Sequence, residues 1–255
     1  MLIESRVRFL DLDFDAAGTD EVIARLKAAS AESPFSYIVT PNVDHMVRLN
    51  LRDAPASLRD AYRSATLCLC DSRVLSRLAR WCGLTLPVVT GSDLTAELLR
   101  HAACPGDRIA IVGGDSSLVP HLAARFPGLD WVQHQPPMGL ATNPAALDAA
   151  AAFVAAERAR FSFLVVGSPQ QEMIALRASR IGGATGTALC VGASLQFLTG
   201  QEKRAPRAVR RLGLEWAYRL ISQPRRMWRR YLVEGPRIFL ITWRWLRSTS
   251  TGSSA

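Results

Sequence analysis

The residues of this sequence that suggest chemistry stand directly after its hydrophobic runs, where strands would end. Four such positions carry polar or glycine-rich sequence: Thr40 and Asn42, Asp71, Gly113-Gly114, and Gly167-Ser168-Pro169-Gln170-Gln171-Glu172. In an open parallel sheet the strands end at one common edge, and ligands bind in the crevice outside it. The spacing therefore predicts a ligand site that is assembled from several strand ends.

Asp71 is the strongest candidate for a catalytic group. It follows the apolar run 66–70 and precedes a helical pattern over 72–81. A carboxylate at a sheet edge can act as a general base and take a proton from a hydroxyl nucleophile. Aspartate also caps helices well, by accepting a hydrogen bond from the backbone of the first turn. The sequence alone leaves both roles open.

The Gly113-Gly114 pair and Asp93 are candidates for binding a nucleotide. A glycine pair between a strand and a helix allows backbone N–H groups to approach a phosphate at the helix N-terminus. The pair lacks the third glycine of a dinucleotide fingerprint and the Gly-Lys-Ser/Thr of a P-loop. Asp93 is either a ligand-binding group or a first-turn carboxylate that the helix dipole stabilises.

Several other kinds of site are not indicated. Asp11, Asp13 and Asp15 fit a metal-binding Asp-x-Asp pattern, but they lie on a strand-like stretch, and we interpret them as surface residues. The histidines share no metal-ligand spacing, and no Gly-x-Ser-x-Gly motif of a serine hydrolase occurs. The five cysteines form no Cys-x-x-Cys pair and lie in apolar settings, which indicates reduced thiols in a cytoplasmic protein.

The elements that must position these residues alternate between strand-like and helix-like runs. This alternation predicts an α/β fold with a largely parallel, Rossmann-like sheet over residues 1–200. The strands are expected at 6–12, 37–40, 66–70, 108–112, 131–133, 161–166 and 188–191. The helices are expected at 20–30, 44–51, 55–64, 72–81, 94–103, 118–126 and 143–158, and after the 167–172 stretch.

A basic and aromatic tail is expected to form a helical appendage over residues 201–247. From Lys203 to Arg247 there are 13 Lys/Arg and two acidic residues, whereas the rest of the chain carries 18 basic and 20 acidic residues. Read as a helix, the segment has one apolar face, formed by Val209, Leu212, Trp216 and Leu220. Such a helix can lie on an anionic membrane, bind nucleic acid through its phosphates, or pack on its own domain.

The ends of the chain carry no membrane-spanning or targeting pattern. The apolar run 238–243 is bracketed by Arg237 and Arg244 and is far shorter than the ~20 residues that a span requires. The N-terminal stretch alternates charged and apolar residues, so no signal peptide is expected. Residues 248–255, rich in Ser and Thr, are expected to be disordered.

Together these stretches resemble the WecG/TagA/CpsF family of bacterial glycosyltransferases, glycosyltransferase family 26, over nearly the whole chain. The α/β part carries the motifs Thr40-Pro41-Asn42-Val43-Asp44-His45, Asp71, Gly91-Ser92-Asp93-Leu94, Gly113-Gly114, 167–172 and Val191-Gly192-Ala193. The tail carries Arg204-Ala205-Pro206, Gly213-Leu214-Glu215-Trp216, Tyr218-Arg219 and the basic run 224–231. The tail motifs are highly specific, whereas the glycine pair alone is not.

The resemblance implies an inverting, metal-independent transferase that needs no cofactor. It would move a sugar from a nucleotide-diphosphate donor, a UDP-sugar, to a polyprenyl-diphosphate-linked sugar in the synthesis of cell-surface polysaccharide. The residues it implicates form three groups: Asp71 as the base, with Thr40 and Asn42; Gly113, Gly114, Asp93, Gln171 and Glu172 at the nucleotide sugar; and Arg204, Arg219, Arg226 and Arg229 at the acceptor diphosphate and the membrane.

The resemblance also implies a peripheral protein on the inner face of the cytoplasmic membrane, with the anionic membrane surface and not nucleic acid as its partner. Departures from the family pattern leave the donor open between N-acetylmannosamine, glucose and a uronate. They lie at Ser72-Arg73, Val88, Gln170, Ala193 and Leu195-Gln196. A homo-oligomer also stays open. The alternative class is a basic-tailed nucleotide- or nucleic-acid-binding module without transferase activity, since interleaved Trp and Arg also suit single strands.

Overall fold

The computed structural model describes residues 5–251, except for the side chains of Arg207, Arg226, Ser250 and Thr251. Its centre is a six-stranded parallel sheet in the order β4-β3-β8-β7-β5-β6. The strands are β3 (Ser36–Val39), β4 (Leu67–Cys68), β5 (Arg108–Val112), β6 (Asp130–His134), β7 (Phe161–Leu164) and β8 (Thr187–Cys190). The fold is therefore α/β and Rossmann-like, as the sequence predicts.

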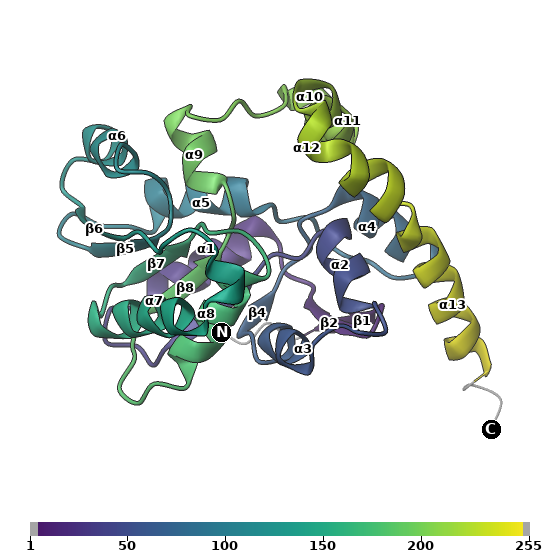
Figure 1. Ribbon diagram of the computed structural model, residues 1–255, viewed down its shortest axis with the longest axis horizontal. Helices are drawn as coiled ribbons and strands as arrows, with labels where there is room; N and C mark the ends of the chain where they lie inside the picture. The colour runs from purple at the N-terminus through teal and green to yellow at the C-terminus, as the bar shows by residue number, and fades with distance from the viewer. Residues whose placement is uncertain (1–4, 252–255) are drawn as a thin grey trace.

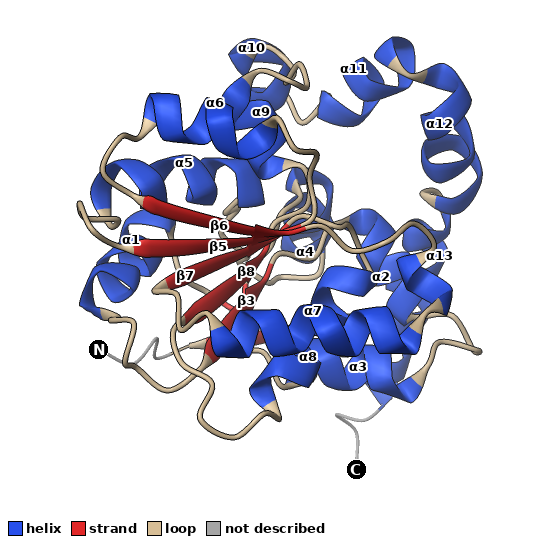
Figure 2. Cartoon of the chain, turned by 60° about the vertical axis from the view of Figure 1, so that its left-hand side comes forward, coloured by secondary structure: helices blue, strands red, loops and turns tan. Residues whose placement is uncertain are grey.

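Helices cover both faces of the sheet (Figure 1, Figure 2). One face carries α1 (Thr19–Ala28), α5 (Gly91–His101), α6 (Leu118–Arg125) and α9 (Ser194–Thr199). The other carries α3 (Ala56–Arg63), α7 (Pro144–Ala156), which follows the 3-10 turn η1 (Leu140–Thr142), and α8 (Gln170–Ser179). Two further helices, α2 (Val43–Leu49) and α4 (Arg73–Trp81), pack into the same core cluster as this second group.

The core follows the period of two that a strand imposes on its side chains. Ile109 and Ile111 of β5 pack with α1, α5, α6 and α9, whereas Val112 packs into the cluster of α3, α7 and α8. Because both faces are covered, each central strand appears in the sequence as a continuous apolar run. This is why the runs 108–112 and 161–166 predict β5 and the start of β7 correctly.

The N-terminal strand prediction is only partly right. Residues 6–12 do not form one strand, because β1 (Arg6–Phe9) and β2 (Leu12–Asp15) make an antiparallel hairpin that is separate from the main sheet. Leu10 and Asp11 in the connecting turn both have positive φ angles, which is the conformation of the commonest two-residue hairpin loops. Leucine at the first position does not signal such a turn in the sequence, although aspartate tolerates the left-handed conformation.

The tail leaves the α/β layers after Gly200 and folds into a series of helices. They are α10 (Arg207–Arg211), α11 (Glu215–Ser222), α12 (Pro224–Trp228), the π-helical segment η2 (Arg229–Glu234) and α13 (Arg237–Thr251). The single amphipathic helix predicted through Val209 and Leu220 does not form, because Gly213 between α10 and α11 adopts a left-handed φ of 76°. Figure 2 shows α11 and α12 on the side of the sheet where the strands end.

The last helix, α13, packs back on the α/β part (Figure 1). Ile238 is buried in the core cluster that contains Phe9, and Trp245 meets Phe9 edge to face with ring centroids 5.4 Å apart. The helix continues to Thr251, although disorder was expected from Ser248, and residues 252–255 lie outside the described part of the chain. None of the described helices has the length and apolar character that crossing a membrane requires.

Candidate active site

A cavity of about 470 Å³ lies at the carboxyl edge of the sheet, between the strand ends and the tail. Its polar side is formed by residues that follow β3 and β4, among them Asn42 and Asp71. The opposite side is formed by the tail and includes Arg219 and the aromatic side chains of Trp216 and Tyr231. The cavity therefore lies between the sheet edge, which carries a carboxylate, and the tail, which contributes apolar and cationic side chains.

Asp71 is half-buried in this cavity, at the end of the loop that follows β4. It does not cap α4, because the side chain of Ser72 does so by accepting a hydrogen bond from the backbone of Leu75 at 3.2 Å. The Asp71 carboxylate instead accepts a hydrogen bond from the backbone N–H of Gly91, at the start of α5, at 3.2 Å. Of the two roles left open by the sequence, the cap belongs to Ser72.

The surroundings of Asp71 raise its pKa to about 7. Burial is the largest cause, because it disfavours the charged form. The carboxylate of Glu215 raises the pKa further, whereas the Gly91 hydrogen bond and the cations Arg219 and Arg204 oppose the shift. A carboxylate that titrates near neutrality can accept a proton and release it again, which suits a general base.

Asn42 and Thr40 fix the end of β3. Asn42 caps α2: its side chain accepts a hydrogen bond from the backbone of Asp44 at 3.1 Å, and its own N–H donates to Nδ1 of His45 at 3.4 Å. Burial lowers the pKa of His45 to about 3, so this imidazole is a neutral acceptor. The buried Thr40 hydroxyl donates to the carbonyl of Cys190 at 3.0 Å. Asn42 lines the cavity, whereas Thr40 is not one of its lining residues and joins the ends of β3 and β8.

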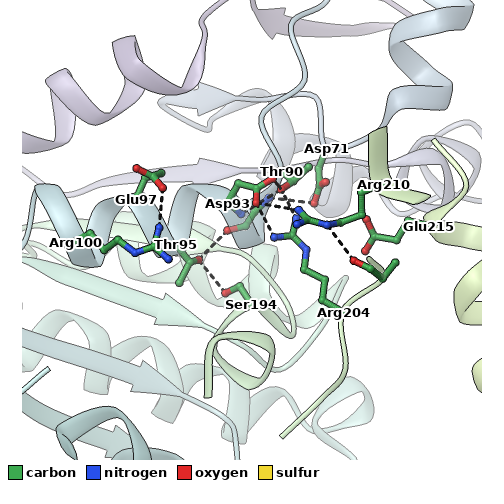
Figure 3. A network of polar contacts seen from close by, with 12 residues as sticks. Asp71, Thr90, Asp93, Thr95, Glu97, Arg100, Ser194, Arg204, Arg210 and Glu215 are labelled. Carbon is green, nitrogen blue, oxygen red and sulfur yellow. Dashed lines mark hydrogen bonds and ion pairs between the residues drawn. The ribbon is translucent and has the colours of Figure 1, made fainter. Parts of the chain in front are cut away.

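Asp93 ties the tail to α5 (Figure 3). One carboxylate oxygen receives Arg204 at 2.6 Å and Arg210 at 3.3 Å, and the other accepts the Thr90 hydroxyl at 2.7 Å. Burial alone would raise the pKa of Asp93, but the hydrogen bonds from Arg204 and Thr90 and the charges of both arginines lower it. The carboxylate predicted to bind the nucleotide sugar is therefore engaged as an anchor for the tail.

Gln171 and Glu172 are buried and hold the loop that follows β8. The side-chain oxygen of Gln171 accepts a hydrogen bond from the backbone of Gly192 at 3.0 Å, and its amide donates to Glu172 at 2.8 Å. Burial raises the pKa of Glu172, although the Gln171 hydrogen bond opposes the shift. Gln171 therefore fixes the backbone of Gly192 after β8, and Glu172 orients the side chain of Gln171.

Gly113 and Gly114 follow β5, four strands from β4 in the sheet. At the usual strand spacing of ~4.8 Å this corresponds to about 19 Å along the edge. Both residues have positive φ angles, and an added Cβ would lie 2.7 Å from Val166 at the first and 2.5 Å from Leu118 at the second. The predicted site residues therefore extend along the whole edge and do not all meet at Asp71.

The tail arginines predicted to meet the acceptor diphosphate have different surroundings. Arg219 lines the cavity, pairs with Glu215 at 3.3 Å and lies over the ring of Phe197 at 5.0 Å. Arg229 is exposed on η2, and the side chain of Arg226 on α12 lies outside the described part of the structure. Of these arginines, Arg204 and Arg219 line the cavity, and Arg204 is held there by Asp93 and Thr90.

Two further arginines of the tail, Arg230 and Arg210, line the cavity without being indicated as site residues by the sequence. Arg230 lines the cavity and pairs with Asp44 at 3.4 Å, and Asp44 also pairs with Arg48 at 2.8 Å. Arg210 shares the carboxylate of Asp93, as described above. No local pattern distinguishes these two arginines from their neighbours, because their partners come from α2 and α5. The aspartate of the Thr-Pro-Asn-Val-Asp-His motif was the available signal for Arg230.

Within residues 5–251 no group of three or more His, Cys, Asp or Glu side chains is arranged to hold a metal ion. The Asp-x-Asp pattern divides between two environments. Asp13 pairs with Arg8 at the surface at 3.4 Å, as expected. Asp15 is not a surface residue, because it is buried, pairs with Arg6 at 3.1 Å and accepts a hydrogen bond from the backbone of Cys68 at 2.7 Å. It joins the hairpin to β4.

Comparison with known families gives one match that spans the fold just described. The model of the Glycosyl transferase WecG/TagA/CpsF family matches residues 7–252. The match includes both the strand edge that carries Asp71 and the tail that forms the other wall of the cavity.

Proposed function

The chain belongs to the WecG/TagA/CpsF family of glycosyl transferases, which act in cell-surface polysaccharide synthesis. We propose that it is an inverting, metal-independent transferase and that Asp71 is its general base. The observation that carries the proposal is a carboxylate with a pKa of about 7 in a cavity between the strand edge and the cationic tail. The donor is a nucleotide-diphosphate sugar, and the acceptor is a sugar on a polyprenyl diphosphate. The family match favours this reaction over the nucleic-acid-binding module that the basic tail left open.

In the proposed reaction Asp71 removes the proton of an acceptor hydroxyl while the hydroxyl oxygen attacks the anomeric carbon of the donor. The new C–O bond forms on the face opposite the leaving group, so the configuration at the anomeric carbon is inverted. The bond to the diphosphate oxygen breaks, and its electron pair leaves with the nucleotide diphosphate. The proton stays on Asp71 until solvent removes it, which a pKa of about 7 permits.

Arg219 and Arg230 line the cavity and supply the positive charge that the leaving diphosphate needs. Guanidinium groups bind phosphate oxygens through paired, charge-assisted hydrogen bonds. Their own carboxylate partners, Glu215 and Asp44, lie 3.3 and 3.4 Å away, which are long distances for such pairs. A diphosphate can therefore compete for both arginines, and the proposal requires no metal ion.

The tail also supports the proposed acceptor, which is embedded in a membrane. Phe239 and Trp216 line the apolar side of the cavity, where the first isoprene units of the lipid would lie. Outside the cavity, Ile221 and Trp228 are exposed among arginines. Apolar and cationic side chains together bind the surface of an anionic bilayer. We therefore place the protein on the inner face of the cytoplasmic membrane.

The test is a transfer assay with a short polyprenyl-diphosphate-linked sugar and EDTA. The donor panel is UDP-glucose, UDP-N-acetylglucosamine, UDP-N-acetylmannosamine, UDP-glucuronate and GDP-mannose. Asp71→Asn keeps an oxygen for the Gly91 hydrogen bond but takes up no proton, so turnover should fall roughly 10²- to 10⁴-fold while donor binding is unchanged. The matched control is Asp53→Asn, at an exposed aspartate. Equal turnover of the Asp71 and Asp53 variants would remove Asp71 from the mechanism.

A further inference from the structure

A second cavity, of about 620 Å³, lies between α5, α9 and the beginning of the tail. It is separate from the cavity that holds Asp71, since Asp71 does not line it, but the two share a wall that contains Asp93, Arg204 and Arg210. Figure 3 shows this wall, with Arg100 and Ser194 on one side of it and Asp71 and Glu215 on the other. A volume of this size is typical of small-molecule sites.

The second cavity is lined by more positive than negative charge. Its cationic side chains are Arg73, Arg100, Arg125, Arg204, Arg210 and Arg211, and its acidic side chains are Asp93 and Glu97. The six arginines and two acids give it a formal charge of +4. Cavities lined by one sign of charge concentrate ions of the opposite sign.

The two acids do not compensate the arginines individually. Asp93 is shared by Arg204 and Arg210, and Glu97 pairs with Arg100 at 2.9 Å. Arg125 donates to a neutral group, the carbonyl of Leu198, at 2.9 Å. For the two remaining arginines, Arg73 and Arg211, no carboxylate lies within ion-pair distance among the described residues.

The shared wall also contains a donor that the protein does not satisfy. Nε of Arg204 is buried and has no hydrogen-bond partner among the described residues, while its two terminal nitrogens bind Asp93 and Thr90. A buried N–H without an acceptor is unfavourable, because it loses its hydrogen bonds to water and gains none in the protein. The charge surplus and the unpaired donor lie in the same wall, and an anion would relieve both.

We propose that this second cavity binds a diphosphate, or an equivalent group with several phosphate oxygens. A single small anion would match only part of the charge, whereas a diphosphate presents enough oxygens to meet guanidinium groups from α5, α6 and the tail together. The group is either a soluble diphosphate or the phosphate headgroups of an anionic lipid. The proposal does not depend on the transfer reaction, because it concerns binding at residues that do not touch Asp71.

The test uses inorganic pyrophosphate as the probe, titrated into the full-length protein at low ionic strength in a calorimeter. Arg125→Gln/Arg211→Gln removes two exposed arginines that line only the second cavity. The matched variant Arg219→Gln/Arg230→Gln removes two that line only the first. We expect the first variant to weaken binding roughly tenfold or more and the second to leave that binding step in place. The melting temperature of each variant is compared with that of the wild type, to check that the fold is intact.

A second arm distinguishes the two sources of phosphate. Co-flotation with phosphatidylglycerol vesicles, against phosphatidylcholine vesicles, is measured for the wild type and for Arg125→Gln/Arg211→Gln. Loss of pyrophosphate binding with unchanged flotation identifies a soluble diphosphate, and loss of flotation without a pyrophosphate step identifies lipid headgroups. If the variant matches the wild type in both arms, the cavity binds no phosphate group and the proposal is overturned.

Discussion

At the scale of single residues, the charge state of Asp71 should be visible in the pH dependence of the proposed reaction. The base form is required, so kcat/KM should rise with pH and level off above about 7. Glu215→Gln removes a like charge that raises the pKa of Asp71, so the midpoint of this rise should move to lower pH. The measurement is a pH–rate profile of the wild type, of Glu215→Gln and of a control at the exposed Glu32. A midpoint that is the same in all three would show that Glu215 does not act on the base.

The same shift makes a prediction about stability. The pKa of Asp71 rises from 3.8 to about 7 on folding, so the folded protein holds this proton more tightly than the unfolded chain does. Stability is therefore lost as the pH rises from about 4 to about 7. The Asp71→Asn variant has no charge to bury at this position. At pH 8 its free energy of unfolding should exceed that of the wild type by about 1–2 kcal/mol, after allowance for the partial exposure of Asp71. Urea should therefore unfold the variant at a higher concentration than the wild type.

The control for this stability difference is the pH itself. Near pH 3 the carboxyl group is neutral in the folded protein and largely so in the unfolded chain, and the two proteins should unfold alike. A variant that is more stable than the wild type, yet inactive, indicates a residue kept for function at the expense of stability. A variant that is less stable at pH 8 would mean that Asp71 holds the fold, in contradiction to the pKa argument.

The identity of the candidate base could be read from the sequence, but its partners could not. The position of Asp71 after an apolar run indicates it as a candidate. Whether Asp71 also caps α4 depends on which side-chain oxygen accepts a hydrogen bond from the first turn of that helix. In the structure this oxygen belongs to the neighbouring residue, Ser72. The contribution of Glu215 depends on a tail that begins more than a hundred residues later in the chain, and no spacing rule predicts such a contact.

At the scale of elements, the contact between η2 and α2 should hold the tail over the cavity. Arg230 meets Asp44 at 3.4 Å, and the side chain of Asp44 is only 14% exposed, so this pair is screened less than a surface pair. A double-mutant cycle with Asp44→Asn and Arg230→Gln should give a coupling of about 0.5–2 kcal/mol. The observable is hydrogen exchange of residues 224–234, which should speed up in either single variant.

An ion pair away from the cavity supplies the comparison. Arg177 and Asp148 join α8 to α7 at 2.8 Å, but Asp148 is 67% exposed, and such pairs contribute at most about 1 kcal/mol. A double-mutant cycle at Arg177 and Asp148 should give a smaller coupling energy than the cycle at Asp44 and Arg230. These control variants should leave the hydrogen exchange of the tail unchanged. If the Asp44–Arg230 coupling is no larger than this control, the tail is held by its apolar contacts alone.

The elements themselves were predictable to different degrees. Central strands such as β5 are buried on both faces, so apolar runs locate them without knowledge of their partners. The β1–β2 hairpin was missed because its turn, Leu10-Asp11, has no glycine or asparagine to mark the positive φ angles. One helix through Val209, Leu212, Trp216 and Leu220 does not form, because Gly213 has a left-handed φ angle and separates α10 from α11.

At the scale of the whole molecule, charge and exposed apolar surface both gather on the tail. The α/β part is close to neutral, whereas residues 203–247 hold 13 Lys/Arg and two acidic residues. Large apolar side chains are exposed on the same segments, including Ile221, Trp228 and Phe239. If the tail binds an anionic bilayer as proposed, its cations would attract the protein at a distance, and its apolar side chains would then hold it at the level of the headgroups. Binding should therefore require both components.

These two components can be separated in a vesicle-binding experiment. Ile221→Ser/Trp228→Ser removes apolar side chains that are 81% and 48% exposed and keeps every charge of the tail. Because burial of one large side chain contributes about 1.5–3 kcal/mol, binding to phosphatidylglycerol vesicles should weaken roughly tenfold or more, while its decrease with added salt should persist. The matched control is Trp81→Ser, at a tryptophan that is 77% exposed on α4, outside the tail. Equal loss in the control would place the membrane-binding face on the α/β part and would leave the tail as a wall of the cavity only.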